Sequence, residues 1–95
     1  MTDLLSDDEI GSRLAGSNWK REGETIVRDW KFKDFAAAME FVNRVADAAE
    51  EANHHPDILV HGWNKVRLVL TNHSAGGLTD PDFAMAQRID DVQGA

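Results

Sequence analysis

The sequence has no cysteine, which excludes disulfide frameworks, thiolate nucleophiles and cysteine-ligated metals. Basic residues are also scarce, since 10 lysines and arginines stand against 17 acids and the formal net charge is -7. No lysine or arginine cluster along the chain reverses this charge locally. Because a negative field repels phosphate backbones, direct binding to nucleic acid is not expected.

Long apolar runs are missing as well. The first eight residues are acidic where a signal peptide would be basic, and no apolar segment approaches membrane-spanning length. We therefore expect a cytoplasmic protein with no membrane span. Its 95 residues, 42% hydrophobic, suffice for one domain over residues 1–95. The modest surface that such a domain buries favours association of identical copies.

The first third of the chain predicts a helix followed by a hairpin. Ser6 and Glu9 have capping-box spacing, and Gly16 can close the helix that they begin. Residues 19–22 and 25–32 are rich in aromatic and β-branched residues and flank a glycine, as the two strands of a hairpin do.

A second unit of the same kind follows. Asp34 is a good N-cap for a long amphipathic helix, which should stop near Asn53 because His55 precedes Pro56. Residues 57–60 and 63–71 predict a second hairpin, with its turn at residues 61–62.

A glycine-rich bend leads from this hairpin into the last helix. Thr79 and Asp82 there have the spacing of another capping box. The predicted order is α-β-β-α-β-β-α in a single domain. Hairpins without crossover connections favour an antiparallel sheet with helices packed on one face, an α+β fold.

Three of the four histidines, His54, His55 and His73, lie at the ends of predicted elements. Imidazole is suited to moving protons near neutral pH. The two arms of the second hairpin are nearly equal in length, so His73 should return beside the adjacent pair. The sequence thus predicts a proton-transfer pocket. His61, next to Gly62 in a predicted turn, fits a surface loop and is assigned no role.

Other functions of these residues are less consistent with their positions. Neighbouring side chains in extended backbone point to opposite sides, which disfavours a zinc site formed by His54 and His55 together. Residues 76–77 lack the lysine and the spacing of a phosphate-binding loop. Asp82 is by itself more simply a helix cap than a catalytic acid. Trp63 is a candidate for the wall of the site or an interface.

The segment from Glu50 through His54-His55-Pro56 and Trp63 to His73 and Asp82 resembles the signature of the pterin-4a-carbinolamine dehydratase family. The resemblance extends over roughly the whole chain and is least specific in the first dozen residues. It implies a four-stranded antiparallel sheet, assembly as a homodimer or homotetramer, and a reaction that needs no metal or other cofactor.

The reaction so implied is that of a hydro-lyase: removal of water from 4a-hydroxytetrahydropterin to give quinonoid dihydropterin. It recycles the tetrahydrobiopterin-type cofactor of aromatic amino acid hydroxylases. The resemblance places the active-site histidines at His54, His55 and His73 and the carboxylate at Asp82. The substrate contacts that we assign on this basis are Glu50, Pro56, Trp63, Asn72, Ser74 and Ala75.

The chemistry agrees with these residues. A carbinolamine loses water once its oxygen is protonated and the adjacent nitrogen is deprotonated, so two imidazoles suffice. We assign the acid and base roles to His54 and His73 in either order, with His55 and Asp82 orienting the substrate or tuning the histidines. The alternative is a non-catalytic interaction or assembly protein, for example a dimerisation cofactor, with the same fold.

Overall fold

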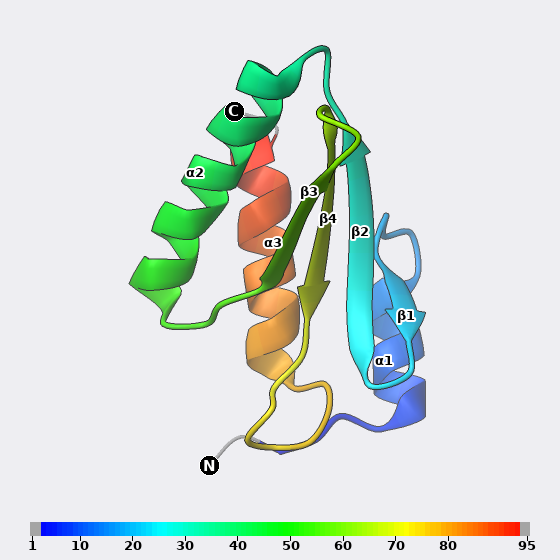
Figure 1. Cartoon of the computed structure of the whole chain (residues 1–95). Coiled ribbons are helices and arrows are strands. Elements are labelled where there is room, and N and C mark those ends of the chain that lie inside the picture. The colour runs from blue at the N-terminus through cyan, green and yellow to red at the C-terminus, as the bar shows by residue number, and fades with distance from the viewer. Residues whose placement is uncertain (1–2, 94–95) are drawn as a thin grey trace.

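The computed structural model describes residues 3–93, which form three helices and four strands (Figure 1). In chain order they are α1 (Asp7–Leu14), β1 (Lys20–Glu22), β2 (Thr25–Lys31), α2 (Phe35–Ala52), β3 (Asp57–His61), β4 (Lys65–Leu70) and α3 (Asp80–Gln93). The α-β-β-α-β-β-α order and the α+β class predicted from the sequence are confirmed.

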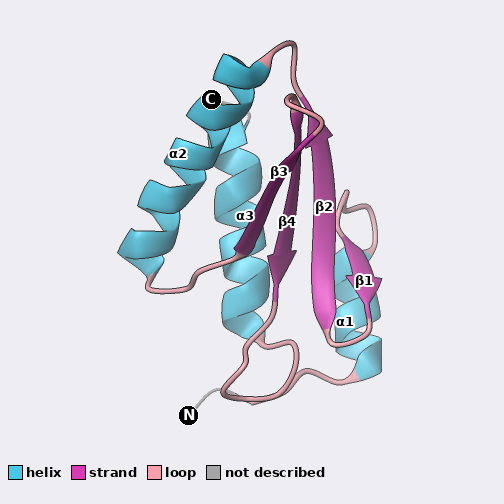
Figure 2. Cartoon of the chain, viewed as in Figure 1, coloured by secondary structure: helices cyan, strands magenta, loops and turns pink. Residues whose placement is uncertain are grey.

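The strands form one antiparallel sheet in the order β1-β2-β4-β3 (Figure 2). Hairpins join β1 to β2 and β3 to β4, and the two hairpins meet where β2 pairs with β4. Strand β3 is therefore an edge strand. The histidine-bearing segments before β3 and after β4 leave the sheet at the same end of this hairpin, because its strands are antiparallel.

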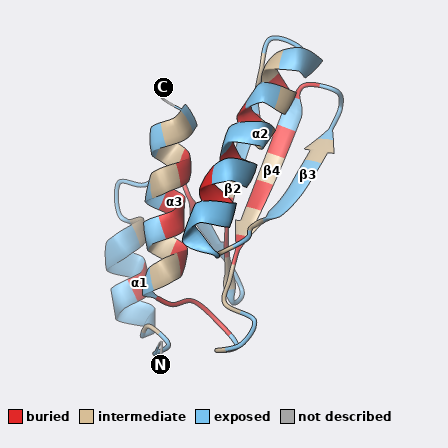
Figure 3. Ribbon diagram, turned by 90° about the vertical axis from the view of Figure 1, so that its left-hand side faces the viewer, coloured by how far each residue is buried: buried red, intermediate tan, exposed pale blue. Residues whose placement is uncertain are grey.

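The three helices pack on one face of the sheet (Figure 3). Alternate residues of β2 and β4 point toward the helices, as the period of two in a strand requires. The buried side chains of this core are Ile26, Trp30, Val66, Leu68 and Leu70 from the sheet, with Ile10, Ala38, Phe41, Val45, Ala48, Ala49, Met85, Ala86 and Ile89 from the helices. The opposite face of the sheet carries no helix among the described residues.

Local signals fix the helix ends. Ser6 and Glu9 form both halves of the predicted capping box, and the Asp34 carboxylate accepts a hydrogen bond from the Ala37 N–H at 2.8 Å. Helix α2 ends at Ala52, one residue before the predicted stop. Of the described helices, none is both long and apolar enough to cross a membrane.

The second hairpin turns later than predicted. His61 is the last residue of β3 and pairs with Lys65, whereas Trp63, expected in the second strand, lies in the turn. Gly62 and Trp63 both have positive φ, at 54° and 58°. Two successive left-handed residues reverse the chain tightly, and a tryptophan in this conformation could not be anticipated from strand propensity.

Candidate active site

The end of α2 sets the direction of His54. Asn53 has a left-handed backbone with φ 50°, and the His54 N–H donates to the Ala49 carbonyl at 3.1 Å. This arrangement satisfies a carbonyl in the last turn of the helix, and asparagine is one of the few residues that accept it readily. The chain then leaves the helix sharply, which brings His54 toward α3 while His55 stays at the surface.

The segment after β4 is a compact loop closed by its own hydrogen bonds. The Asn72 N–H donates to the Gly77 carbonyl at 3.1 Å, and the Gly76 N–H donates to the Asn72 carbonyl at 2.9 Å. The Asn72 side chain accepts a third bond, from the Ala75 N–H at 3.0 Å. These bonds hold His73 and Ser74 in an exposed position at the end of the sheet.

The two segments line one open cleft of about 380 Å³. Its walls are formed by Asn53, His54, His55, Thr71, Asn72, His73 and Ser74. The volume is within the range of about 300–1,000 Å³ found for small-molecule sites. The three histidines predicted to converge are therefore brought together, as the equal arms of the hairpin required.

His54 is the only one of the three histidines tied to a fully buried group. Its Nε2 lies 2.6 Å from Asp82 Oδ1, with 16% of the His54 side chain exposed and none of Asp82. The second carboxylate oxygen accepts hydrogen bonds from the Thr79 N–H at 2.8 Å and the Thr79 hydroxyl at 3.0 Å. Asp82 is thus both the helix cap expected from the sequence and the partner of a histidine.

This geometry selects one form of the His54 ring. A carboxylate only accepts hydrogen bonds, so the Asp82 side chain stabilises the tautomer that carries its proton on Nε2. Nδ1 is then the nitrogen through which the ring can exchange a proton with a molecule in the cleft. Because Asp82 is buried behind the imidazole, it acts on the cleft through His54 and does not itself line it.

His55 is held in a different way. Its Nε2 lies 2.7 Å from Glu50 Oε2, and both side chains are more than half exposed. Solvent screens such a surface pair, so it adds little to stability. Its geometric effect is to direct the His55 ring back along α2.

The remaining residues predicted as substrate contacts are dispersed. Pro56 and Ala75 adjoin the cleft in sequence but do not line it. Trp63 lies in the turn at the far end of the β3–β4 hairpin and is 62% exposed. Five residue steps separate Lys65 from Leu70, about 17 Å of strand. Within one chain, Trp63 is therefore remote from the histidines, and its predicted role in the site wall or an interface stays a prediction.

Sequence reasoning missed the contribution of Thr79. Its spacing to Asp82 marked a helix start, but nothing local showed that the same carboxylate would face His54. It also missed Asn53 and Thr71 as cleft residues. The position of Asn53 could have been inferred, because asparagine often ends a helix and Asn53 precedes an extended histidine-proline pair.

Within residues 3–93, no group of three or more His, Asp or Glu side chains is placed to hold a metal ion.

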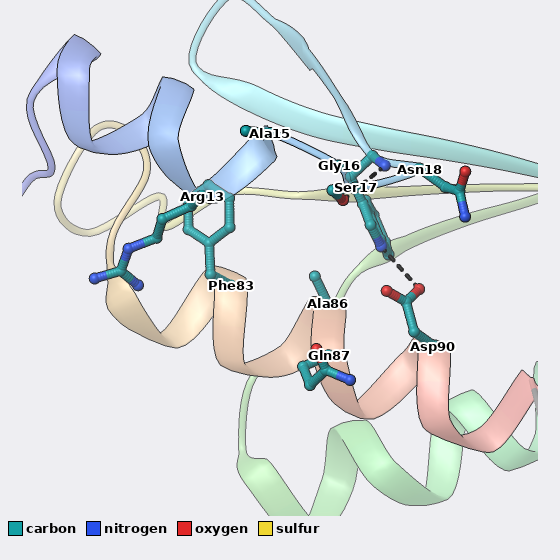
Figure 4. Close-up of a pocket in the computed structure, with 10 residues that line it drawn as sticks. Arg13, Ala15, Gly16, Ser17, Asn18, Phe83, Ala86, Gln87 and Asp90 are labelled. Atoms are coloured by element: carbon teal, nitrogen blue, oxygen red, sulfur yellow. Dashed lines mark hydrogen bonds between the residues drawn. The ribbon is translucent and has the colours of Figure 1, made fainter.

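A second pocket, of about 480 Å³, lies on another side of α3, between that helix and the loop after α1 (Figure 4). Its Asp90 accepts hydrogen bonds from Trp19 Nε1 at 2.9 Å and from Arg28 at 2.6 Å. Its Arg13 pairs with Asp80 and lies over the Phe83 ring. The charged groups of this pocket are therefore already paired, and no histidine lines it.

Comparison with known proteins agrees with this architecture. The family model described as Pterin 4 alpha carbinolamine dehydratase matches residues 3–92. A protein of Thermomicrobium roseum, provisionally named as a pterin-4-alpha-carbinolamine dehydratase, is 50% identical over 86 residues, which cover 90% of this chain and 91% of the relative.

Two solved structures are also similar. One is a transcriptional coactivator/pterin dehydratase from Brucella melitensis, with a TM-score of 0.88, 32% identity and coverage of 95% of this chain and 98% of that one. The other is a pterin dehydratase-like protein identified as a RuBisCO assembly factor in the alpha-carboxysome, with a TM-score of 0.69, 25% identity and coverage of 82% and 92%.

Fold and site thus define the class of this protein: a small α+β domain with a histidine-lined cleft at one end of its sheet. The chain belongs to the pterin 4 alpha carbinolamine dehydratase family, whose named reaction is that of a hydro-lyase.

Proposed function

We propose that this protein dehydrates 4a-hydroxytetrahydropterin to quinonoid dihydropterin, with His54 and His73 as the proton-transfer groups. The observation that carries the proposal is the single cleft lined by three histidines, one of them fixed by a buried carboxylate. Family membership supplies the pterin. The hydrogen bond to Asp82 supplies a reason why His54 in particular would be chemically competent.

The reaction requires two proton transfers around one carbon atom. The C4a–O bond breaks as the leaving hydroxyl takes a proton and departs as water, and N5 loses its proton as the C4a–N5 double bond forms. One imidazole gives the first proton and the other accepts the second, so no covalent intermediate is needed. Asn72, Ser74 and Ala75 lie in the loop beside His73, where we place contacts to the polar edge of the pterin.

A spectroscopic assay tests the proposal directly. The purified chain should accelerate the ultraviolet change that accompanies loss of 4a-hydroxytetrahydropterin, and a chelator should leave the rate unchanged because histidines alone carry the protons. The no-enzyme reaction provides the baseline. A rate equal to that baseline would refute the proposal, and chelator-sensitive activity would indicate a metal-dependent reaction instead.

We expect Asp82→Asn to lower kcat about 100-fold with little change in KM, because an amide can donate to Nε2 and so favour the wrong tautomer of His54. Nitrogen NMR of the His54 ring should show this change of tautomer. Thr79→Val keeps the backbone donor and removes only the hydroxyl, and should have a smaller effect. Unchanged kcat in Asp82→Asn would show that His54 needs no fixed tautomer.

The alternative is a role in binding or assembly, as described for one of the structurally similar proteins. Asp82 also caps α3, but a protein that serves only in binding has no chemical need for a cleft histidine held against that carboxylate. The presence of the His54–Asp82 pair in this chain therefore favours the enzyme. The spectroscopic assay above separates the two functions.

We further infer that the protein acts as a homodimer or homotetramer. Strand β3 is an edge strand, and its Ile58 and Leu59 are 39% and 53% exposed. Unpaired edges with apolar side chains favour pairing with another chain. Light scattering of the purified protein measures the mass of the assembly.

The proposed product would be returned to the cofactor pool of an aromatic amino acid hydroxylase.

A further inference from the structure

The uncovered face of the sheet carries an unusual row of basic side chains. Lys31 of β2 pairs directly with Lys65 of β4, and Lys65 pairs in turn with His61 of β3. Paired residues in adjacent strands project to the same side, so these three side chains, called the basic row below, lie next to one another. Neighbouring strands are about 4.8 Å apart, so the row spans about 10 Å.

Among the described residues, no carboxylate forms a salt bridge with a member of the basic row, although Asp29 lies close enough to His61 to interact with it electrostatically. Neither lysine, nor His61, has a carboxylate within salt-bridge distance in residues 3–93. Like charges directly opposite each other across a sheet are destabilising. The arrangement is notable in a chain with a net charge of -7, where acidic partners are abundant. The sequence shows no such cluster, because the three residues are brought together only by the pairing of three strands.

The carboxylate that lines the same pocket is already engaged. Asp29, in the adjacent position along β2, receives two hydrogen bonds from Arg67, at 2.9 and 3.1 Å. The Arg67 guanidinium holds the pKa of the Asp29 carboxyl below its ordinary value of 3.8. Asp29 is therefore ionised at neutral pH and bonded to Arg67, and it forms no salt bridge with Lys31 or Lys65.

The basic row forms part of a hollow. Lys31, His61, Lys65 and Arg67 line a shallow pocket of about 390 Å³, together with Asp29 and Trp30. The chain turns at Gly62, where a Cβ atom would lie 3.7 Å from Lys65 Nζ. The Lys65 ammonium group therefore lies beside the turn, and Lys65 is exposed.

We propose that the basic row is a binding site for a small, soluble ligand that bears phosphate groups. Two ammonium groups and an imidazole in line can each donate to phosphate oxygens. The net negative charge of the protein repels a long polyanion such as nucleic acid, so the ligand is small. The site is separated from the histidine cleft by the length of β4 and does not depend on the proposed reaction.

The experiment uses inorganic pyrophosphate as the probe, at constant ionic strength. Titration into the isotope-labelled protein should shift the amide signals of residues 31, 61 and 65. Lys65→Gln should weaken binding about fivefold, the upper end for an exposed ion pair, and Lys31→Gln/Lys65→Gln by more. Shifts confined to the histidine cleft, or equal affinity of wild type and double variant, would overturn the proposal.

Lys20→Gln is the matched control. Lys20 pairs with Val27 and therefore lies on the same face of the sheet, but about 13 Å along the strands from the basic row. The Lys20→Gln substitution removes the same charge and should change pyrophosphate affinity less than twofold. An effect equal to that of Lys65→Gln would mean that only overall charge matters.

Two further outcomes also overturn the proposal. One is sedimentation of the protein with phosphatidylglycerol vesicles without pyrophosphate binding, and the other is a change of oligomeric state in the double variant.

Discussion

Replacing His54 and His73 together by alanine should reduce the dehydration rate to that of the uncatalysed reaction. The two imidazoles are proposed to carry both proton transfers, and each general acid or base contributes about 10²–10⁴-fold. Each single variant should retain part of the acceleration, because the other proton transfer is still assisted. The measurement is kcat/KM from the ultraviolet assay, with the no-enzyme rate as the floor.

The matched control replaces two exposed polar residues on the outer surface of α2, Asn43→Ala/Asp47→Ala, and should retain wild-type activity. Circular dichroism of both double variants shows whether the fold persists. Alanine at residue 54 leaves Asp82 buried without its histidine, which costs stability, so His54→Gln/His73→Gln serves as a second, more conservative variant. Full activity in a folded double variant would exclude these histidines as the acid and base.

Phe41→Ala should cost about 3–5 kcal/mol of folding free energy, the usual range for removing a buried phenylalanine. Phe41 is 2% exposed, and its ring centroid lies 4.8 Å from that of Trp30 and 5.2 Å from that of Phe32. It therefore joins α2 to the sheet. At about 4–8 °C per kcal/mol for a domain of this size, Tm should fall by at least about 12 °C.

Phe35→Ala is the control for this loss, because Phe35 lies on the same helix but is 54% exposed. It should change the free energy of unfolding by no more than about 0.5 kcal/mol. Urea denaturation measures both variants, and Phe41→Leu provides a milder change if Phe41→Ala does not fold. Equal losses at the two positions would show that burial against Trp30 does not determine the contribution of Phe41.

Local signals account for the success of the sequence in predicting the element order. Capping residues such as Ser6, Asp34 and Asp82 act within a few residues of themselves, and apolar periodicity distinguishes helix from strand over a short window. The convergence of His54 and His73 also followed from local information, because a hairpin with equal arms returns the chain to its start.

The misplacement of Trp63 shows where such signals fail. Aromatic residues favour strands, and the sequence pattern placed Trp63 in one. In the structure, the pairing of His61 with Lys65 fixes the register of the hairpin and leaves Trp63 in the turn. Packing of the alternate residues Val66, Leu68 and Leu70 against the helices selects this register, because a slip of one residue would expose them.

The sequence by itself determined the fold class, the helix ends and the set of histidines that could transfer protons. Only the tertiary structure decided that Asp82 lies buried behind His54 and that Lys31, Lys65 and His61 stand side by side. The reason is physical: caps and periodicity act between near neighbours. The hydrogen bond between His54 and Asp82 spans 28 residues, and the basic row spans three strands, so both exist only once the strand register is fixed and the core is packed.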